Sequence, residues 1–318
     1  MFRRTAPIFC VLATALTCLA ANKVASLDVR LLSTMLTADE GYGEWGFAAV
    51  VVADGHRILF DTGAHPDTVL RNARELHVDL SNVPDVILSH HHLDHTAGLV
   101  TLRREYARTN PAAFARAHVG AGIFRSRTDG GADEANPMIA TKRDYEAAGG
   151  TFIEYNQTRE LFPGVWLTGP VPRKYPERNW SPGRRLRLAD GGTAEDNLPE
   201  DQSLIIVTDK GLVVISGCGH AGIVNTLEYA RATIAPAPIY AALGGFHLYR
   251  ASDDTLAWTA SKLKEFGLQN LLGAHCTGIE AVYRLRQLTG LDRKTASVGA
   301  VGGGFNLATG LDPGSIAQ

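Results

Sequence analysis

Short apolar runs recur along the chain and alternate with segments whose apolar residues follow the period of an α-helix. The runs at 48–53 and 56–60 are separated by an Asp-Gly pair, which suits a two-residue turn between antiparallel strands. The runs at 203–208 and 212–216 are separated by Asp-Lys-Gly and predict a second hairpin. Further strands are predicted at 85–89, 239–243 and 270–274.

Segments with helical periodicity lie between these strands. Helices are predicted at 67–76, 96–108, 138–148, 221–233, 253–266 and 278–289. Strands interleaved with helices indicate a layered α/β or α+β fold. The stretch 156–202 is rich in Pro, Gly and Arg, so we expect long loops there with a few short strands. Because no linker-like segment interrupts the pattern, we expect one domain over residues 22–318.

Residues 1–21 differ from the rest of the chain. An arginine pair precedes an apolar run from Ala6 to Leu19, and small residues follow it, which is typical of a secretory signal peptide. The run is shorter than the ~20 apolar residues that a membrane-spanning helix needs, although a retained membrane anchor is the alternative. We therefore expect a cleaved signal peptide, a periplasmic or secreted protein, and no stable membrane insertion after cleavage.

Composition narrows the classes of partner. The 318 residues carry a formal charge of −2, and 45% of them are hydrophobic, which is typical of a globular protein. The near-neutral charge argues against nucleic acid bound by a basic surface, so we expect a small-molecule substrate. Four cysteines in a chain of this length do not indicate a disulfide framework. The composition predicts no particular oligomeric state.

A polar cluster follows the end of each of several predicted strands. These clusters are Asp-Thr-Gly at 61–63, His-His-His-Leu-Asp-His at 90–95, Gly-Cys-Gly-His at 217–220, Gly-Gly-Phe-His at 244–247 and His-Cys-Thr-Gly at 275–278. In layered α/β folds, ligand sites form beyond the carboxyl ends of the strands. We therefore expect the clusters to meet at one site.

The cluster at 90–95 predicts a metal centre. In an extended segment His90, His92 and Asp94 point to one side, His91 points away, and His95 follows where a helix can begin. Imidazole and carboxylate groups suit Zn²⁺, Fe or Mn. Four such groups exceed what one metal usually takes from a single loop, so two adjacent divalent ions are expected, with a single-metal site as the alternative.

The His90-x-His92-x-Asp94-His95 pattern resembles the signature of the metallo-β-lactamase superfamily. The segments LFDTG, GCGHAGIVN, GGFHL and HCTG resemble a subgroup of metal-dependent hydrolases that includes the dihydropterin ribofuranosylaminobenzene-phosphate synthases. The resemblance covers residues 28–310. It implies a four-layer αββα sandwich with metal ions, zinc foremost, at one edge of the two sheets. It also implies a metal-dependent hydrolase that acts on an ester, lactone, phosphoester or amide.

The resemblance also implies a ligand set. The implied ligands are His90, His92 and His220 for the first metal, and Asp94, His95 and His275 for the second. The chain departs from the family at Gly217-Cys218, where most members have an aspartate that bridges the metals. Cys218 can take that place as a thiolate. Alternatively Cys218 is simply buried, and Asp201 or His247 contributes.

Other residues receive supporting roles. Asp61 is expected to orient a ligand through hydrogen bonds, and Cys276 to face the core, away from the site. Asp94 is expected to orient the nucleophile, and His247 to contact substrate or transfer a proton. A transferase resembling the dihydropterin synthases and a non-catalytic metal-binding or sensor protein are the alternative functions.

Overall fold

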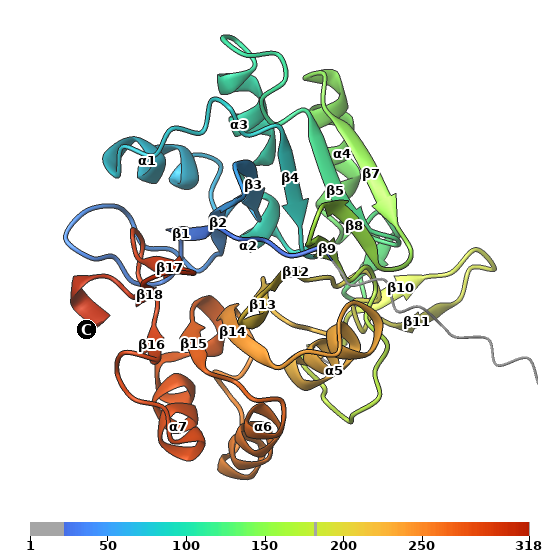
Figure 1. Ribbon diagram of the computed structural model, residues 1–318. Helices are drawn as coiled ribbons and strands as arrows, with labels where there is room; N and C mark the ends of the chain where they lie inside the picture. Colours follow the sequence, from blue (N-terminus) through green and yellow to red (C-terminus); the bar gives the residue numbers. More distant parts are fainter. Residues whose placement is uncertain (1–21, 181–182, 318) are drawn as a thin grey trace, which may run out of the picture.

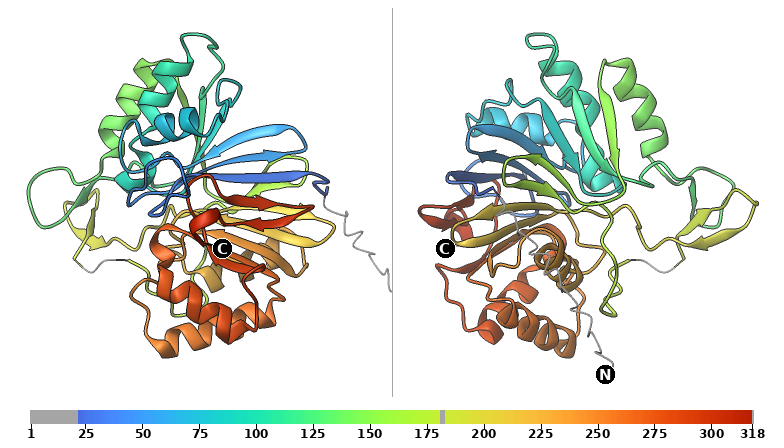
Figure 2. Two further views of the ribbon diagram at one scale, coloured as in Figure 1. Left: turned by 90° about the vertical axis from the view of Figure 1, so that its left-hand side faces the viewer. Right: turned by 45° about the vertical axis from the view of Figure 1, so that its right-hand side comes forward.

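A computed structural model describes residues 22–180 and 183–317 (Figure 1). The signal peptide expected at 1–21 lies outside the described residues. Two large sheets stack against each other, and helices cover the outer face of each (Figures 1 and 2). Across the two described ranges, no helix combines the length and the apolar character needed to cross a membrane.

The first sheet has eight strands. In spatial order they are β18 (Gly310–Asp312), β17 (Gly304–Asn306), β1 (Leu27–Ser33), β2 (Ala48–Ala53), β3 (His56–Phe60), β4 (Asp85–Leu88), β5 (Arg116–Gly120) and β7 (Thr151–Tyr155). Strands β2 and β3 form the predicted antiparallel hairpin, whereas β3, β4, β5 and β7 run parallel. The helices that pack on this sheet are α1 (Thr68–Glu75), α3 (Leu99–Tyr106) and α4 (Met138–Ala147).

The second sheet has seven strands. In spatial order they are β16 (Ala296–Val298), β15 (Asn270–Gly273), β14 (Ile239–Gly244), β13 (Gly211–Ser216), β12 (Leu204–Thr208), β9 (Val165–Leu167) and β8 (Arg159–Phe162). The predicted hairpin of β12 and β13 is antiparallel, and β13 to β16 run parallel. The helices on this sheet are α5 (Ile223–Thr233), α6 (Asp253–Glu265) and α7 (Ile279–Thr289).

Alternating side chains make three apolar layers. In β12, Leu204 and Ile206 join the core between the two sheets, whereas Ile205 and Val207 join the core under the helices. In β2, Val51 faces the core between the sheets, and Val50 faces the helices of the first sheet. Because successive side chains of a strand point to opposite faces, continuous apolar runs bury both faces of each sheet. The result is the predicted four-layer αββα arrangement.

One predicted helix differs from the structure. The helix expected at 96–108 is split into α2 (Leu93–Thr96) and α3, so the first turn already begins inside the histidine cluster. The stretch 156–202 carries short strands among its loops, as expected. Two of them, β10 (Arg185–Arg187) and β11 (Thr193–Glu195), pair with β6 (Arg127–Thr128) in a small sheet that projects from the sandwich (Figure 2).

Candidate metal centre

The polar clusters at the strand ends come together at one edge between the two sheets. Strands β3 and β4 run parallel in the first sheet, and β13, β14 and β15 run parallel in the second, so the carboxyl ends of each set lie at one edge. The two sets meet directly. Cys218 Sγ, after β13, lies 3.2 Å from His95 Nε2, after β4. The convergence expected from the sequence is therefore present.

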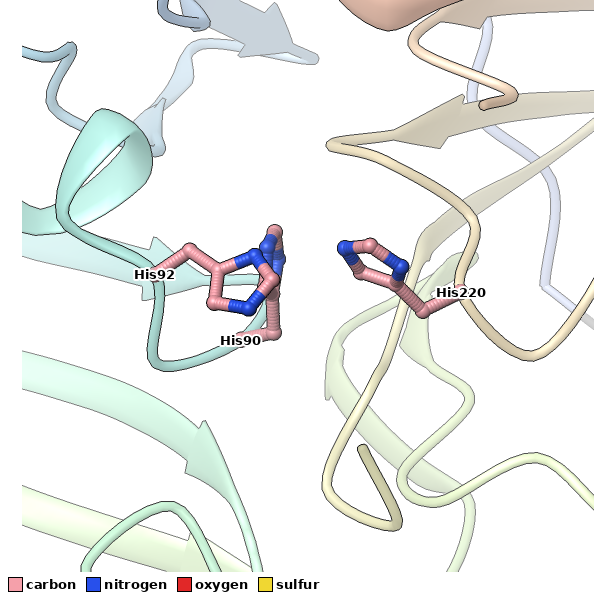
Figure 3. Close-up of side chains that lie close together, drawn as sticks. All are labelled: His90, His92 and His220. Atoms are coloured by element: carbon pink, nitrogen blue, oxygen red, sulfur yellow. The ribbon is translucent and has the colours of Figure 1, made fainter. Parts of the chain in front are cut away.

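Three histidines form the first ligand group. His90, His92 and His220 each offer a ring nitrogen, and these nitrogens lie within 4.8 Å of one another. Figure 3 shows the rings of the first two facing that of His220 across a short gap. Within the described chain, Nε2 of His90 and Nε2 of His220 are buried and have no hydrogen-bond partner. Buried polar atoms without partners are costly, and a cation bound between these nitrogens would supply the missing partner.

A second group combines a carboxylate with two imidazoles. Atoms of Asp94, His95 and His275 lie within 4.8 Å of one another. Asp94 Oδ2 lies 3.4 Å from His275 Nε2 and 3.8 Å from His95 Nε2. The Asp94 side chain is 23% exposed, whereas both histidine side chains are fully buried. The carboxylate is thus the member of this group that solvent reaches.

Cys218 lies between the two groups. It shares one set of close ligand atoms with His90 and His95, and another with His220 and His247. Its sulfur therefore lies close to candidate ligand atoms of both groups. The alternative donor, Asp201, accepts the backbone N–H of Ala221 at 2.9 Å and so supports the loop that carries Cys218 and His220. Burial raises the pKa of Asp201 to about 7.

The prediction that Cys276 faces away from the site is wrong. Its Sγ lies 3.2 Å from Cys218 Sγ, and it forms a set of close ligand atoms with Cys218 and His275. The prediction assumed the alternation of an extended strand. Instead β15 ends before a 3-10 turn, His275–Thr277, in which His275 has φ of +47°. In such a turn, successive side chains do not alternate between two faces.

Hydrogen bonds at Nδ1 orient the rings of two candidate ligands, His90 and His95. Asp61 Oδ2 lies 2.7 Å from His95 Nδ1 and also accepts the Ser89 hydroxyl at 2.7 Å. The same hydroxyl lies 2.9 Å from His90 Nδ1. A hydroxyl that donates to Asp61 can accept from His90, so both Nδ1 atoms carry the proton and both Nε2 atoms can bind a cation. Ser89 was missed in the sequence, where it reads as the last residue of a buried strand.

His220 is oriented by a loop that the sequence analysis did not single out. Its Nδ1 donates to the backbone oxygen of Asn179, and the side-chain amide of Asn179 donates to the Gly219 oxygen at 3.2 Å. Two residues earlier, Glu177 accepts the backbone N–H groups of Val224 and Asn225 at 3.1 and 2.8 Å. These N–H groups are the unpaired donors of the first turn of α5.

Glycine permits this contact between the loop and the helix. Gly222 precedes α5 with φ of +97°, and a Cβ added there would lie 2.2 Å from Glu177 Oε2. The loop formed by residues 174–179 is therefore fixed against α5, and we call it the His220 support loop. Asn225 strengthens it by accepting the backbone N–H groups of Lys174 and Tyr175 at 2.8 and 2.7 Å.

The electrostatics favour neutral imidazoles in the first ligand group and an ionised carboxylate at Asp94. Burial and neighbouring imidazoles hold the pKa of His90 and of His92 well below the usual range, and burial lowers the pKa of His220 to about 3. Burial opposes ionisation of Asp94, but His95 and His275 outweigh it and lower the pKa of Asp94. Neutral imidazole and carboxylate are the forms that bind metal ions.

Two cavities border the centre. One of about 500 Å³ is lined by His92 and Asp94 together with Glu134 and Arg184. The other, of about 720 Å³, is lined by His247 and by Trp180, Tyr249, Trp258, Arg178 and Arg250. Residues of the histidine cluster after β4 thus border one cavity, and His247 borders the other.

His91 belongs to a buried ion-pair network, whereas His247 lies beside the first ligand group. His91 Nδ1 lies 2.7 Å from Glu200, whose other oxygen accepts from the fully buried Arg127 at 2.7 Å. This network attaches the histidine loop to the small three-stranded sheet. His247 lies in the loop after β14 with φ of +51°, and its ring centroid is 4.7 Å from that of His220.

Comparisons with known proteins agree on a family. The model of the metallo-β-lactamase superfamily matches residues 45–109. The 7,8-dihydropterin-6-methyl-4-(β-D-ribofuranosyl)-aminobenzene-5′-phosphate synthase of Methanocaldococcus jannaschii is 32% identical over 234 residues, which cover 71% of this chain and 76% of that protein. A second, uncharacterized protein of that organism is 30% identical and covers 82% and 94% of the two chains.

A solved structure agrees with these relatives. The crystal structure of Tm1679, a metal-dependent hydrolase of the β-lactamase superfamily, matches with a TM-score of 0.70 at 26% identity, over 88% of this chain and 98% of that chain. The chain belongs to the metallo-β-lactamase superfamily. The expected fold and the expected resemblance to the dihydropterin synthases are confirmed. The roles of individual site residues stay predictions.

Proposed function

We propose that the protein is a metal-dependent hydrolase that binds two divalent ions, with zinc as the first candidate and Fe or Mn as alternatives. The observation that carries this proposal is the pair of adjacent ligand groups, one with His90, His92 and His220 and the other with Asp94, His95 and His275. A divalent ion bound there would supply Lewis acidity, which activates water near neutral pH and polarises the bond to be cleaved.

Side chains that line the two cavities are placed to orient the attacking water and to transfer a proton. Asp94 is the solvent-reached member of its group and borders the cavity of about 500 Å³, so it is placed to orient the attacking water. His247 borders the cavity of about 720 Å³, and its buried Nδ1 has no hydrogen-bond partner within the described residues. It is therefore placed to give a proton to a leaving group. The substrate is a small molecule with an ester, lactone, phosphoester or amide bond.

The test couples elemental analysis of the purified protein to a substrate panel of esters, lactones, phosphodiesters and β-lactams. Turnover should disappear with a chelator and return with one defined metal. His92→Ala and Asp94→Ala should each abolish turnover and reduce metal content, whereas His77→Asn, at an exposed position in the left-handed region, should change neither. Full turnover in either ligand variant would refute the site assignment.

A second candidate is a transferase, because the curated relative is named as a synthase of a ribofuranosyl-aminobenzene phosphate. Formation of such a product by purified protein would favour it. The proposed export signal speaks against it, because phosphorylated biosynthetic intermediates are normally cytoplasmic. A third candidate is a non-catalytic metal-binding or sensor protein, favoured by two tightly bound ions without turnover on the panel.

Export is proposed separately from the reaction. A periplasmic or secreted location rests on the residues at 1–21. N-terminal sequencing of the protein from its own cells should find a mature start near Asn22. A chain that still begins at Met1 in the cytoplasm would contradict export and would favour the transferase.

A further inference from the structure

We propose that Cys218, His275 and Cys276 form a thiophilic cation position that overlaps the second ligand group, so that soft ions bind through sulfur and harder ions through Asp94. This inference rests on the second ligand group of the proposed metal centre and concerns which ion binds there and through which atoms. Its readout is metal binding, so its failure can be distinguished from a failure to find hydrolase activity.

The two sulfurs are held together by separate loops. Cys218 follows β13, and Cys276 lies in the 3-10 turn after β15, yet their Sγ atoms are 3.2 Å apart. Both thiols are free and buried. Ligand atoms of Cys218, Cys276 and His275 lie within 4.8 Å of one another. Two sulfurs and an imidazole are a ligand set typical of tetrahedral zinc sites.

The backbone approaches the Cys276 sulfur closely. The N–H of His247 points at Cys276 Sγ from 3.3 Å. The neighbouring strand end approaches closely because it carries Gly245, where an added Cβ would lie 2.9 Å from Cys276 Sγ and 1.9 Å from the Gly217 oxygen.

His275 links the two positions. Its Nε2 faces Asp94 Oδ2 at 3.4 Å, as part of the group with His95. The same residue belongs to the sulfur group. Its Nδ1 is buried and has no hydrogen-bond partner among the described residues. Carboxylate oxygen prefers harder ions such as Mn²⁺, whereas thiolates prefer softer ions such as Zn²⁺ and Cd²⁺. The centre therefore offers one hard and one soft set of atoms around a shared imidazole.

The experiment uses reduced, metal-free protein titrated with Cd²⁺, and follows the sulfur-to-cadmium charge-transfer absorption. Wild type should show this band. Cys276→Ser should lose part of the band and should bind Cd²⁺ at least ~10-fold more weakly, since even indirect partners of a metal cost that much. The Mn²⁺ affinity of Cys276→Ser should stay within about 2-fold of wild type, because the oxygen set is intact.

Two comparisons make the result decisive. Thr277→Ser, in the same turn, keeps the hydroxyl that bonds Gly244 and Phe246, so it should leave the band unchanged. Thermal unfolding of the metal-free variants shows whether each is folded. A band unchanged in folded Cys276→Ser overturns the proposal. An equal loss of Cd²⁺ and Mn²⁺ affinity also overturns it, since Cys276 would then support the whole centre rather than one set of atoms.

Discussion

Asp61 Oδ2 lies 2.7 Å from Nδ1 of His95, and both side chains are fully buried. This contact fixes the ring of His95 with its Nε2 toward Cys218 and Asp94. The carboxylate comes from the end of β3, where Asp61 has φ of +57°. A residue outside both candidate ligand groups thus fixes the orientation of the His95 ring.

Replacement of Asp61 tests this orientation. Asp61→Ala should weaken binding at the second metal position by ~10–100-fold, as is usual for partners of metal-bound histidines. Asp61→Asn keeps one acceptor oxygen and should lose less. The measurement is metal affinity by competition with a chromophoric chelator, at a temperature where circular dichroism shows both variants folded. Wild-type affinity in folded Asp61→Ala would contradict the assigned role.

The His220 support loop gives a second prediction. Glu177→Ala removes the acceptor for the first turn of α5 and should release the carbonyl of Asn179 that orients His220. We expect metal content at the first position to fall toward that of His220→Ala, with affinity reduced ~10-fold or more. Glu177→Gln keeps one acceptor oxygen and serves as the matched control. Equal metal content in wild type and Glu177→Ala would show that His220 is held without this loop.

Acid should destabilise the metal-free protein. The pKa values of His90, His92 and His220 are lowered in the fold from about 6.5, the last to about 3. Between these values the unfolded chain binds more protons than the native protein, so the free energy of unfolding falls as the pH falls from about 6.5 toward 3. Each such histidine contributes ~1.4 kcal/mol per pH unit within its window.

Thermal unfolding at several pH values measures this effect. His220→Gln removes one titrating group and should give a shallower decline below pH 6.5. His77→Asn, at an exposed histidine, should follow wild type. An identical slope in wild type and His220→Gln would mean that His220 is not buried in its neutral form.

Metal removal should lower thermal stability. An ion that binds only the native protein stabilises it by ~4 kcal/mol when its free concentration is 1,000 times the Kd. For a chain of this size, that corresponds to a fall in Tm of roughly 10 °C on chelation. Differential scanning fluorimetry with and without chelator measures the fall. The double variant His92→Ala with His275→Ala should show almost no chelator effect, and a full effect there would place the ions elsewhere.

Ligand sites of layered α/β folds form beyond the carboxyl ends of strands, and this is why much of the candidate site could be predicted from the sequence. Four of its ligand candidates lie within the segment 90–95, directly after a buried strand, and the clusters at 217–220, 244–247 and 275–278 follow parallel strands of the second sheet. Apolar runs that bury both faces are also easy to recognise, which is why both predicted hairpins form as expected. At the strand-end clusters and the two hairpins, the local sequence pattern alone therefore predicts the position in the fold.

Other features depend on tertiary contacts. Strand β5 was not predicted because it contains the polar residues Arg116 and His118. Both side chains contact Asp85 of the neighbouring strand β4, and this partner cannot be recognised from the local sequence. The direction of Cys276 depends on a turn with positive φ at a non-glycine residue, which sequence rarely signals. Asn179 acts through its backbone oxygen, so its side chain carries no signal of that role.

The placement of ligands on both sheets has a consequence for the order of folding. Cys218 and His95 lie 123 positions apart in the chain but 3.2 Å apart in space. An ion bound between these residues would therefore cross-link the two sheets, and it can do so only after the sheets have docked. Interactions that form this late slow unfolding and leave the folding rate almost unchanged. Bound metal should thus slow the unfolding of the assembled sandwich without speeding its folding.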